Sequence, residues 1–140
     1  MDKVYIDCDI ILDLLSKREP FFKSAAALFS MVERGEINAC VSPLIFANLF
    51  YILRKAASAE KAIDTLKKFR LLVDVLPVNE KIIELALSSG LPDFEDSLHY
   101  YTALENGIYY LITRNKKHYK KPEIIICTAE EFVQSKKVNQ

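Results

Sequence analysis

Residues 4–15 have the sequence VYIDCDIILDLL, in which a short apolar run ends at Asp7 and apolar residues at helical spacing follow. We expect a buried strand over 3–8 and a short helix over 10–17. A carboxylate at the end of a strand faces the negative carbonyl ends of its own backbone and is often half desolvated. A bound cation would relieve that cost, so Asp7 is a candidate functional residue.

Strand-like and helix-like segments alternate along the rest of the chain. Further strands are predicted over 37–41, 73–76, 109–113 and 124–127, and further helices over 24–34, 43–56, 59–71, 80–88, 93–107 and from 128 onward. The strands are short, apolar and rich in β-branched residues, which is typical of a parallel sheet covered on both faces. The sequence predicts an α/β fold, a three-layer α/β/α sandwich around a mostly parallel sheet of four to five strands, in one domain over 1–140.

The overall charge does not identify a partner. The chain has 19 Lys and Arg against 19 Asp and Glu, so a nucleic-acid partner requires an uneven distribution of charge. Two charges near the N-terminus argue against a signal peptide, and the uncharged run 37–53 contains polar residues and is short for a membrane span. We expect a cytoplasmic protein with no membrane segment, whose three cysteines are buried thiols in a reducing compartment.

A second acidic group precedes the strand predicted over 109–113. Asp93, Glu95 and Asp96 open a helix, and the strand that follows this helix ends at Thr113. Ligands of parallel α/β sheets bind at the carboxyl ends of the strands. Two carboxylates that meet there provide the oxygen ligands that Mg²⁺ requires.

Some of these acidic residues also have structural explanations. Asp93 is a plausible helix N-cap, Glu95 a solvent-exposed residue of the first turn, and Asp9 a cap for a helix that begins at Ile10. Asp7 and Asp96 are harder to explain by structure alone.

Three segments together resemble the PIN domain family: residues 4–15, DFEDSLHYYTAL at 93–104 and YLITRN at 110–115. The resemblance extends from residue 4 to about residue 132. PIN domains are mostly Mg²⁺- or Mn²⁺-dependent ribonucleases, and many short bacterial and archaeal members are VapC-like toxins of type II toxin–antitoxin pairs. The resemblance therefore implies Mg²⁺ or Mn²⁺ as cofactor, RNA as substrate and an antitoxin as protein partner.

The same resemblance implies the site residues. The catalytic set carried over from the family is Asp7, Asn48, Asp96, Thr113 and Asn115, with Asp7 and Asp96 as metal ligands. Asp93 is a further candidate metal ligand, a neighbouring carboxylate that could move into the site. Thr113 would orient Asp96 or a water molecule. The chain departs from the family at Asn48, where a Glu is usual, and at His118-Tyr119, where many members have Asp-Phe. An amide can coordinate a cation but adds no charge, so the acidic site has a deficit.

A basic segment follows Thr113. Arg114, Lys116, Lys117, Lys120 and Lys121 could hold an RNA backbone, and Tyr119 could stack on a base. The alternative is a solvated loop. We expect His118 to be an exposed loop residue and His99 a helix-surface residue.

An aromatic stripe at helical spacing, Phe46, Phe50 and Tyr51, indicates core packing or a contact with a second subunit. Because PIN domains commonly dimerise, we expect a homodimer that uses this stripe.

Three functions remain open. The first is a metal-dependent endoribonuclease, and the second is a degenerate PIN domain that binds RNA or a partner protein without cleavage, as the neutral Asn48 suggests. A small-molecule enzyme on a Rossmann-like sheet is disfavoured, because no glycine-rich phosphate loop follows the first strand.

Overall fold

The computed structural model describes residues 2–119 and 122–138. Its strands are β1 (Asp2–Ile6), β2 (Ile37–Val41), β3 (Val73–Val75), β4 (Tyr110–Ile112) and β5 (Ile125–Cys127). Its α-helices are α1 (Cys8–Leu15), α2 (Phe22–Glu33), α3 (Pro43–Ala56), α4 (Ala59–Arg70), α5 (Glu80–Leu87), α6 (Phe94–Glu105) and α7 (Ala129–Val138), with a short 3₁₀ helix over Lys116–His118. These bounds differ from the predicted ranges by a few residues at most.

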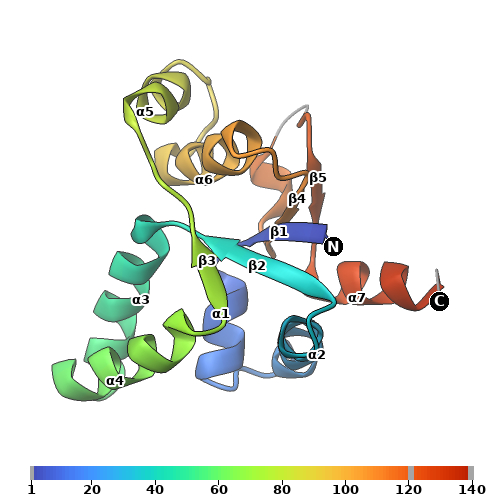
Figure 1. The fold of residues 1–140 in the computed structure, drawn as a ribbon. Helices are drawn as coiled ribbons and strands as arrows, with labels where there is room; N and C mark the ends of the chain where they lie inside the picture. The colour runs from blue at the N-terminus through green and yellow to red at the C-terminus, as the bar shows by residue number, and fades with distance from the viewer. Residues whose placement is uncertain (1, 120–121, 139–140) are drawn as a thin grey trace.

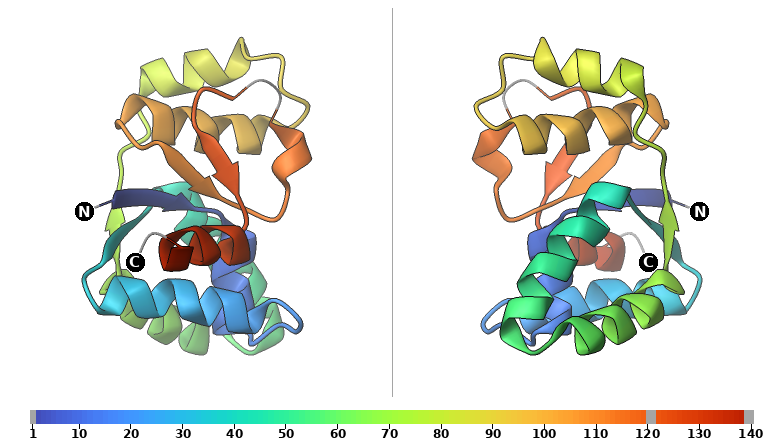
Figure 2. Two further views of the ribbon diagram at one scale, coloured as in Figure 1. Left: turned by 90° about the vertical axis from the view of Figure 1, so that its right-hand side faces the viewer. Right: turned by 90° about the vertical axis from the view of Figure 1, so that its left-hand side faces the viewer.

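The five strands form one parallel sheet in the order β3-β2-β1-β4-β5. Helices α5 and α6 lie on one side of the sheet, and the other helices lie on the opposite side (Figures 1 and 2). This arrangement is the predicted three-layer α/β/α sandwich, and its sheet is wholly parallel.

Strand β1 lies in the middle of the sheet, where both of its faces are covered. Val4, Tyr5 and Ile6 have no exposed surface, which explains why the strand reads as a continuous apolar run. Full burial of each such side chain contributes about 1.5–3 kcal/mol to stability. A second, smaller core of Ile82 and Leu98 joins α5 to α6.

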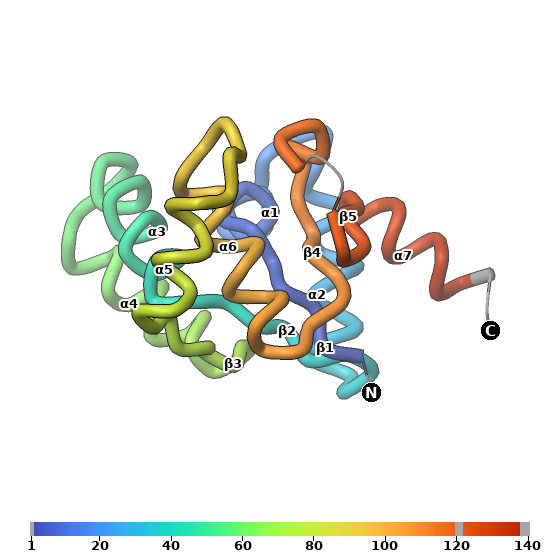
Figure 3. Tube along the Cα trace, turned by 90° about the horizontal axis from the view of Figure 1, so that it is seen from above, coloured from blue at the N-terminus to red at the C-terminus, as the bar shows by residue number. Residues whose placement is uncertain are grey.

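The chain changes direction in the sheet around β1. Strands β2 and β3 extend the sheet on one side of β1, and the chain then returns through α5 and α6 to place β4 on the other side (Figure 3). A ligand site is expected where the strand order reverses, beyond the carboxyl ends of β1 and β4.

The helix starts place acidic residues at this edge. Helix α1 begins at Cys8 with Asp7 as its N-cap, so Asp9 lies in the first turn and does not cap a helix beginning at Ile10. Asp93 caps α6 by accepting a hydrogen bond from the Asp96 backbone N–H at 3.0 Å. Across residues 2–119 and 122–138, the helices are all too short or too polar to cross a membrane.

Candidate functional site

A pocket of about 420 Å³ opens at the carboxyl ends of β1 and β4. Its lining combines side chains from the loops after β1, α1 and β4 and from helices α1, α3 and α6: Asp7, Cys8, Asp9, Leu12, Arg18, Asn48, Tyr51, Ile52, Glu95, Asp96 and Asn115. Four of these residues are carboxylic acids and one is a base, so the pocket is acidic although the whole chain is neutral.

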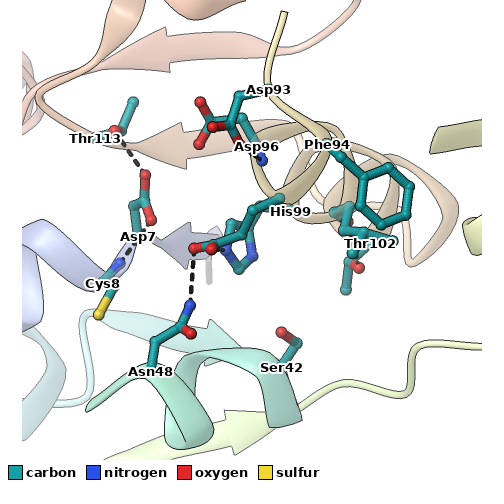
Figure 4. Close-up of polar contacts among 12 residues, drawn as sticks. Asp7, Cys8, Ser42, Asn48, Asp93, Phe94, Asp96, His99, Thr102 and Thr113 are labelled. Atoms are coloured by element: carbon teal, nitrogen blue, oxygen red, sulfur yellow. Dashed lines mark hydrogen bonds and ion pairs between the residues drawn. The ribbon is translucent and has the colours of Figure 1, made fainter. Parts of the chain in front are cut away.

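Asp7 is buried and held in one orientation (Figure 4). Its Oδ1 accepts a hydrogen bond from the Cys8 backbone N–H at 2.7 Å, and its Oδ2 accepts one from Thr113 Oγ1 at 2.8 Å. Thr113 therefore orients Asp7, which corrects the expectation that it orients Asp96 or a water molecule. Each Asp7 oxygen retains a lone pair for a further ligand.

Asp96 lies in the first turn of α6, and its Oδ2 is 2.7 Å from Nδ1 of His118. Burial raises the pKa of Asp96, and the negative charges of Asp7 and Asp93 raise it further, while the hydrogen bond with His118 lowers it. The expectation that His118 is a simple exposed loop residue is wrong, because the short 3₁₀ helix carries its ring to Asp96.

Asp9 is the least satisfied carboxylate of the pocket. Its Oδ2 accepts a hydrogen bond from the Arg114 backbone N–H at 3.1 Å, but its buried Oδ1 has no partner among the residues in the structure. Burial and the charge of Asp7 raise the pKa of Asp9 to about 6. A cation near Asp9 would compensate for both features.

Asn48 of α3 and Glu95 of α6 meet on another side of the pocket. The Asn48 side-chain N–H donates to Glu95 Oε1 at 2.8 Å. Glu95 thus lines the pocket, although its side chain remains 51% exposed. The nearby His99 ring, whose Nε2 lies 3.5 Å from Glu95 Oε1, is the main cause of a lowered pKa at Glu95.

His99 is buried, which corrects the expectation of a helix-surface residue. Its Nδ1 lies 2.6 Å from the Tyr5 hydroxyl oxygen, and that hydroxyl donates to Ser42 Oγ at 2.9 Å. The sequence contains a signal for the contact between His99 and Glu95, because the two residues are four positions apart on the same helix face.

The basic segment after Thr113 is arranged differently from the prediction. Arg114 binds buried Asp13 through two hydrogen bonds of 3.0 and 3.1 Å, and its guanidinium lies 4.0 Å from the centre of the Phe21 ring. Lys116 pairs with Glu131 at 2.9 Å. These two cations are therefore already engaged by carboxylates.

Tyr119 is only 6% exposed, so it is not available to stack on a base as expected. Lys117 is exposed, and Lys120 and Lys121 lie outside the described residues.

Asn115 lines the pocket, and its backbone N–H donates to Thr113 Oγ1 at 3.1 Å. Asp93 acts as the cap of α6 and is not among the described residues that line the pocket.

The donor atoms of the pocket suit a hard divalent cation, because they are carboxylate and amide oxygens. In the described part of the chain, no three His, Cys, Asp or Glu side chains are placed to enclose a metal ion. Mg²⁺ commonly uses one or two carboxylates and keeps several waters. Asp7 and Asp96 fit that mode of binding, and the unpaired Oδ1 of Asp9 agrees with a positive charge nearby.

Comparisons with known proteins agree with this architecture. "Ribonuclease VapC1" of Aquifex aeolicus is 24% identical over 136 residues, which cover 94% of this chain and 93% of that protein. A toxin–antitoxin complex from Klebsiella pneumoniae matches with a TM-score of 0.68 at 18% identity, covering 90% of this chain and 97% of that one. DNA-bound VapBC from Salmonella typhimurium matches with a TM-score of 0.65 at 20% identity, covering 92% and 99%.

The family model described as "PIN domain" matches residues 3–117, which include Asp7, Asn48, Asp96 and Thr113. The match covers strands β1 to β4 and ends within the short 3₁₀ helix that carries His118. The chain therefore belongs to the PIN domain family.

Proposed function

We propose that this protein is a metal-dependent endoribonuclease that hydrolyses RNA phosphodiester bonds and serves as the toxin of a type II toxin–antitoxin pair. One observation carries the proposal: Asp7 and Asp96, from distant parts of the chain, line one pocket, and Thr113 holds Asp7 in place. The ribonuclease name of the Aquifex relative supports the activity, and the toxin–antitoxin complexes with the same fold support an antitoxin partner.

The cofactor in this proposal is Mg²⁺ or Mn²⁺, held by Asp7 and Asp96. When bound, such an ion polarises a phosphoryl oxygen and lowers the pKa of a bound water so that it becomes a nucleophile near neutral pH. The protein contributes the positions of its ligands. Thr113 fixes Asp7, His118 fixes Asp96, and Asn48 fixes Glu95 beside them.

A homodimer also remains part of the proposal. Phe46 and Phe50 of the predicted aromatic stripe pack against the core, whereas Tyr51 is 58% exposed. The stripe thus offers a second copy less surface than the sequence predicted, and the homodimer is proposed without an assigned contact surface.

The test is cleavage of a mixed RNA pool with Mg²⁺, with Mn²⁺ and with EDTA. Asp7→Asn and Asp96→Asn should each lower the metal-dependent rate by more than about 100-fold, because each removes a ligand and its charge. Asp64→Asn, an exposed carboxylate on α4, is the matched control and should cleave normally. Cleavage that survives EDTA or both pocket substitutions would contradict the proposal.

A second candidate is a PIN domain that binds RNA without cutting it. The neutral Asn48 favours this function, since its N–H group is directed at Glu95 and the residue adds no charge to the pocket. Calorimetry with Mn²⁺ separates the two candidates. A chain that binds RNA but releases no heat with Mn²⁺ and yields no cleavage products supports the binding role.

A further inference from the structure

The acidic pocket is bordered by a surface that the metal site does not use. Arg18, just after α1, and Tyr51, on α3, both line the pocket. The Tyr51 ring is 58% exposed, and its neighbour Ile52 is 40% exposed. An exposed aromatic ring beside a polar pocket contributes little to folding but offers a flat face to a ligand.

Arg54 completes this surface one helical turn further along α3. Its guanidinium carbon lies 5.5 Å from the centre of the Tyr51 ring and 5.7 Å from that of Phe50. The two rings contact each other edge to face at 6.2 Å. Phe50 and Arg54 thus restrict the Tyr51 ring, so the ring loses less conformational entropy when a ligand binds.

The cations of this surface differ from those of the loop after β4. Within the residues in the structure, neither Arg18 nor Arg54 forms an ion pair, whereas Arg114 and Lys116 are bound to Asp13 and Glu131. The charges of Arg18 and Arg54 are therefore available to a phosphate backbone, which the four carboxylates of the pocket would otherwise repel.

We infer that Arg18, Tyr51 and Arg54, which we call the α3 rim, form the contact surface for single-stranded RNA. The inference rests on the proposed ribonuclease function and names the residues that hold its substrate. Arg18 and Arg54 contact phosphates, and Tyr51 stacks on a base. Stacking requires an unpaired base, because the faces of paired bases are covered by their neighbours in the helix.

The test measures binding of a short, fluorescently labelled, unstructured RNA by anisotropy in EDTA, where no metal-dependent cleavage occurs. Tyr51→Ala should weaken binding by roughly 5- to 100-fold, because one base–aromatic stack is lost. Tyr51→Phe should bind like the wild type, since the ring remains. Arg18→Gln and Arg54→Gln should each reduce the salt dependence of binding by about 0.7 in log–log slope.

Two matched controls come from the same chain. Tyr109, which is 66% exposed, directly precedes β4 and so lies at the opposite end of the sheet from the pocket. Tyr109→Ala should leave RNA binding unchanged. Lys68→Gln, an exposed lysine on α4 that does not line the pocket, should also leave RNA binding unchanged.

Several results would overturn the inference. They are wild-type affinity in Tyr51→Ala, equal affinity for a duplex of the same sequence, or no RNA binding by the wild-type chain. Unchanged RNA binding together with loss of a dimer in light scattering of Tyr51→Ala would instead assign the rim to contact between two copies. Because binding is read without metal, a chain that binds through the rim but never cleaves contradicts only the proposed function. A chain that cleaves normally with Tyr51→Ala contradicts only the α3 rim.

Discussion

Carboxylates lie on both sides of the end of β4, and their partners differ. Thr113 turns to Asp7 in the pocket, while the next residue, Arg114, turns to Asp13. Asp13 is 1% exposed and paired with the Arg114 guanidinium, whereas the pocket is lined by four carboxylates and one arginine, Arg18. Asp13 is neutralised by a cation of the same chain, whereas among the described residues no cationic side chain pairs with Asp7 or Asp9, which are therefore available to a positively charged ligand.

The first prediction concerns the buried pair of Asp13 and Arg114. Arg114→Ala leaves Asp13 buried without a partner, so the free energy of unfolding should fall by about 3–5 kcal/mol in urea denaturation. Replacing both residues, Asp13→Leu with Arg114→Met, should recover most of that loss, because no buried charge is then left unpaired. A loss below about 1 kcal/mol in Arg114→Ala would show that the fold does not depend on neutralising Asp13, and the contrast with the pocket carboxylates would then fail.

The second prediction concerns the link between β4 and the pocket. Thr113→Val keeps the shape of the side chain and removes the hydrogen bond to Asp7, so Mn²⁺ affinity in calorimetry should fall by about 10- to 100-fold. Thr65→Val on α4 is the control and should bind Mn²⁺ like the wild type. Unchanged affinity in Thr113→Val would mean that Asp7 needs no orientation.

The third prediction uses pH. Since the pKa of Asp9 is raised from 3.8 to about 6, the folded chain binds more protons than the unfolded chain between these values. The contribution of Asp9 to the free energy of unfolding therefore falls as the pH rises through this window and stays low above it. Asp9→Asn should be more stable than the wild type by about 1–2 kcal/mol at pH 7, after allowance for partial exposure.

This difference should be much smaller at pH 4, where Asp9 is protonated in the folded chain and close to its pKa of 3.8 in the unfolded chain. Urea denaturation at pH 4 and pH 7 measures it, with Asp64→Asn as an exposed control that shows no such change. A variant that is less stable than the wild type at pH 7 would show that Asp9 is already compensated within the protein.

The smallest effect on stability is expected at the exposed pair of Lys116 and Glu131. Lys116 and Glu131 have side chains 44% and 50% exposed, so Lys116→Ala should change the free energy of unfolding by less than about 1 kcal/mol. The same urea titration with and without added salt checks this. A larger loss would place Lys116 with Arg114 among the charges that hold the fold.

The sequence was most informative where a local pattern determines the outcome. The apolar run before Asp7 and the cap at Asp93 predicted a strand end and a helix start, and the structure has both. Thr113 and Asp7 are 106 positions apart, so their contact depends on the strand order and is not visible in any short segment. The sequence could place Tyr119 in a basic loop but could not show its burial, because this depends on packing against α6.

The same separation has a consequence for protein synthesis. A growing chain on the ribosome already carries Asp7 in its first few residues, but it lacks the neighbouring strand until β4 and Thr113 have been translated and have left the exit tunnel. Asp96 also arrives late, on α6. An unfinished copy therefore has no assembled acidic pocket. With the proposed nuclease activity, the protein would not cleave the messenger RNA from which it is being made until most of its chain is complete.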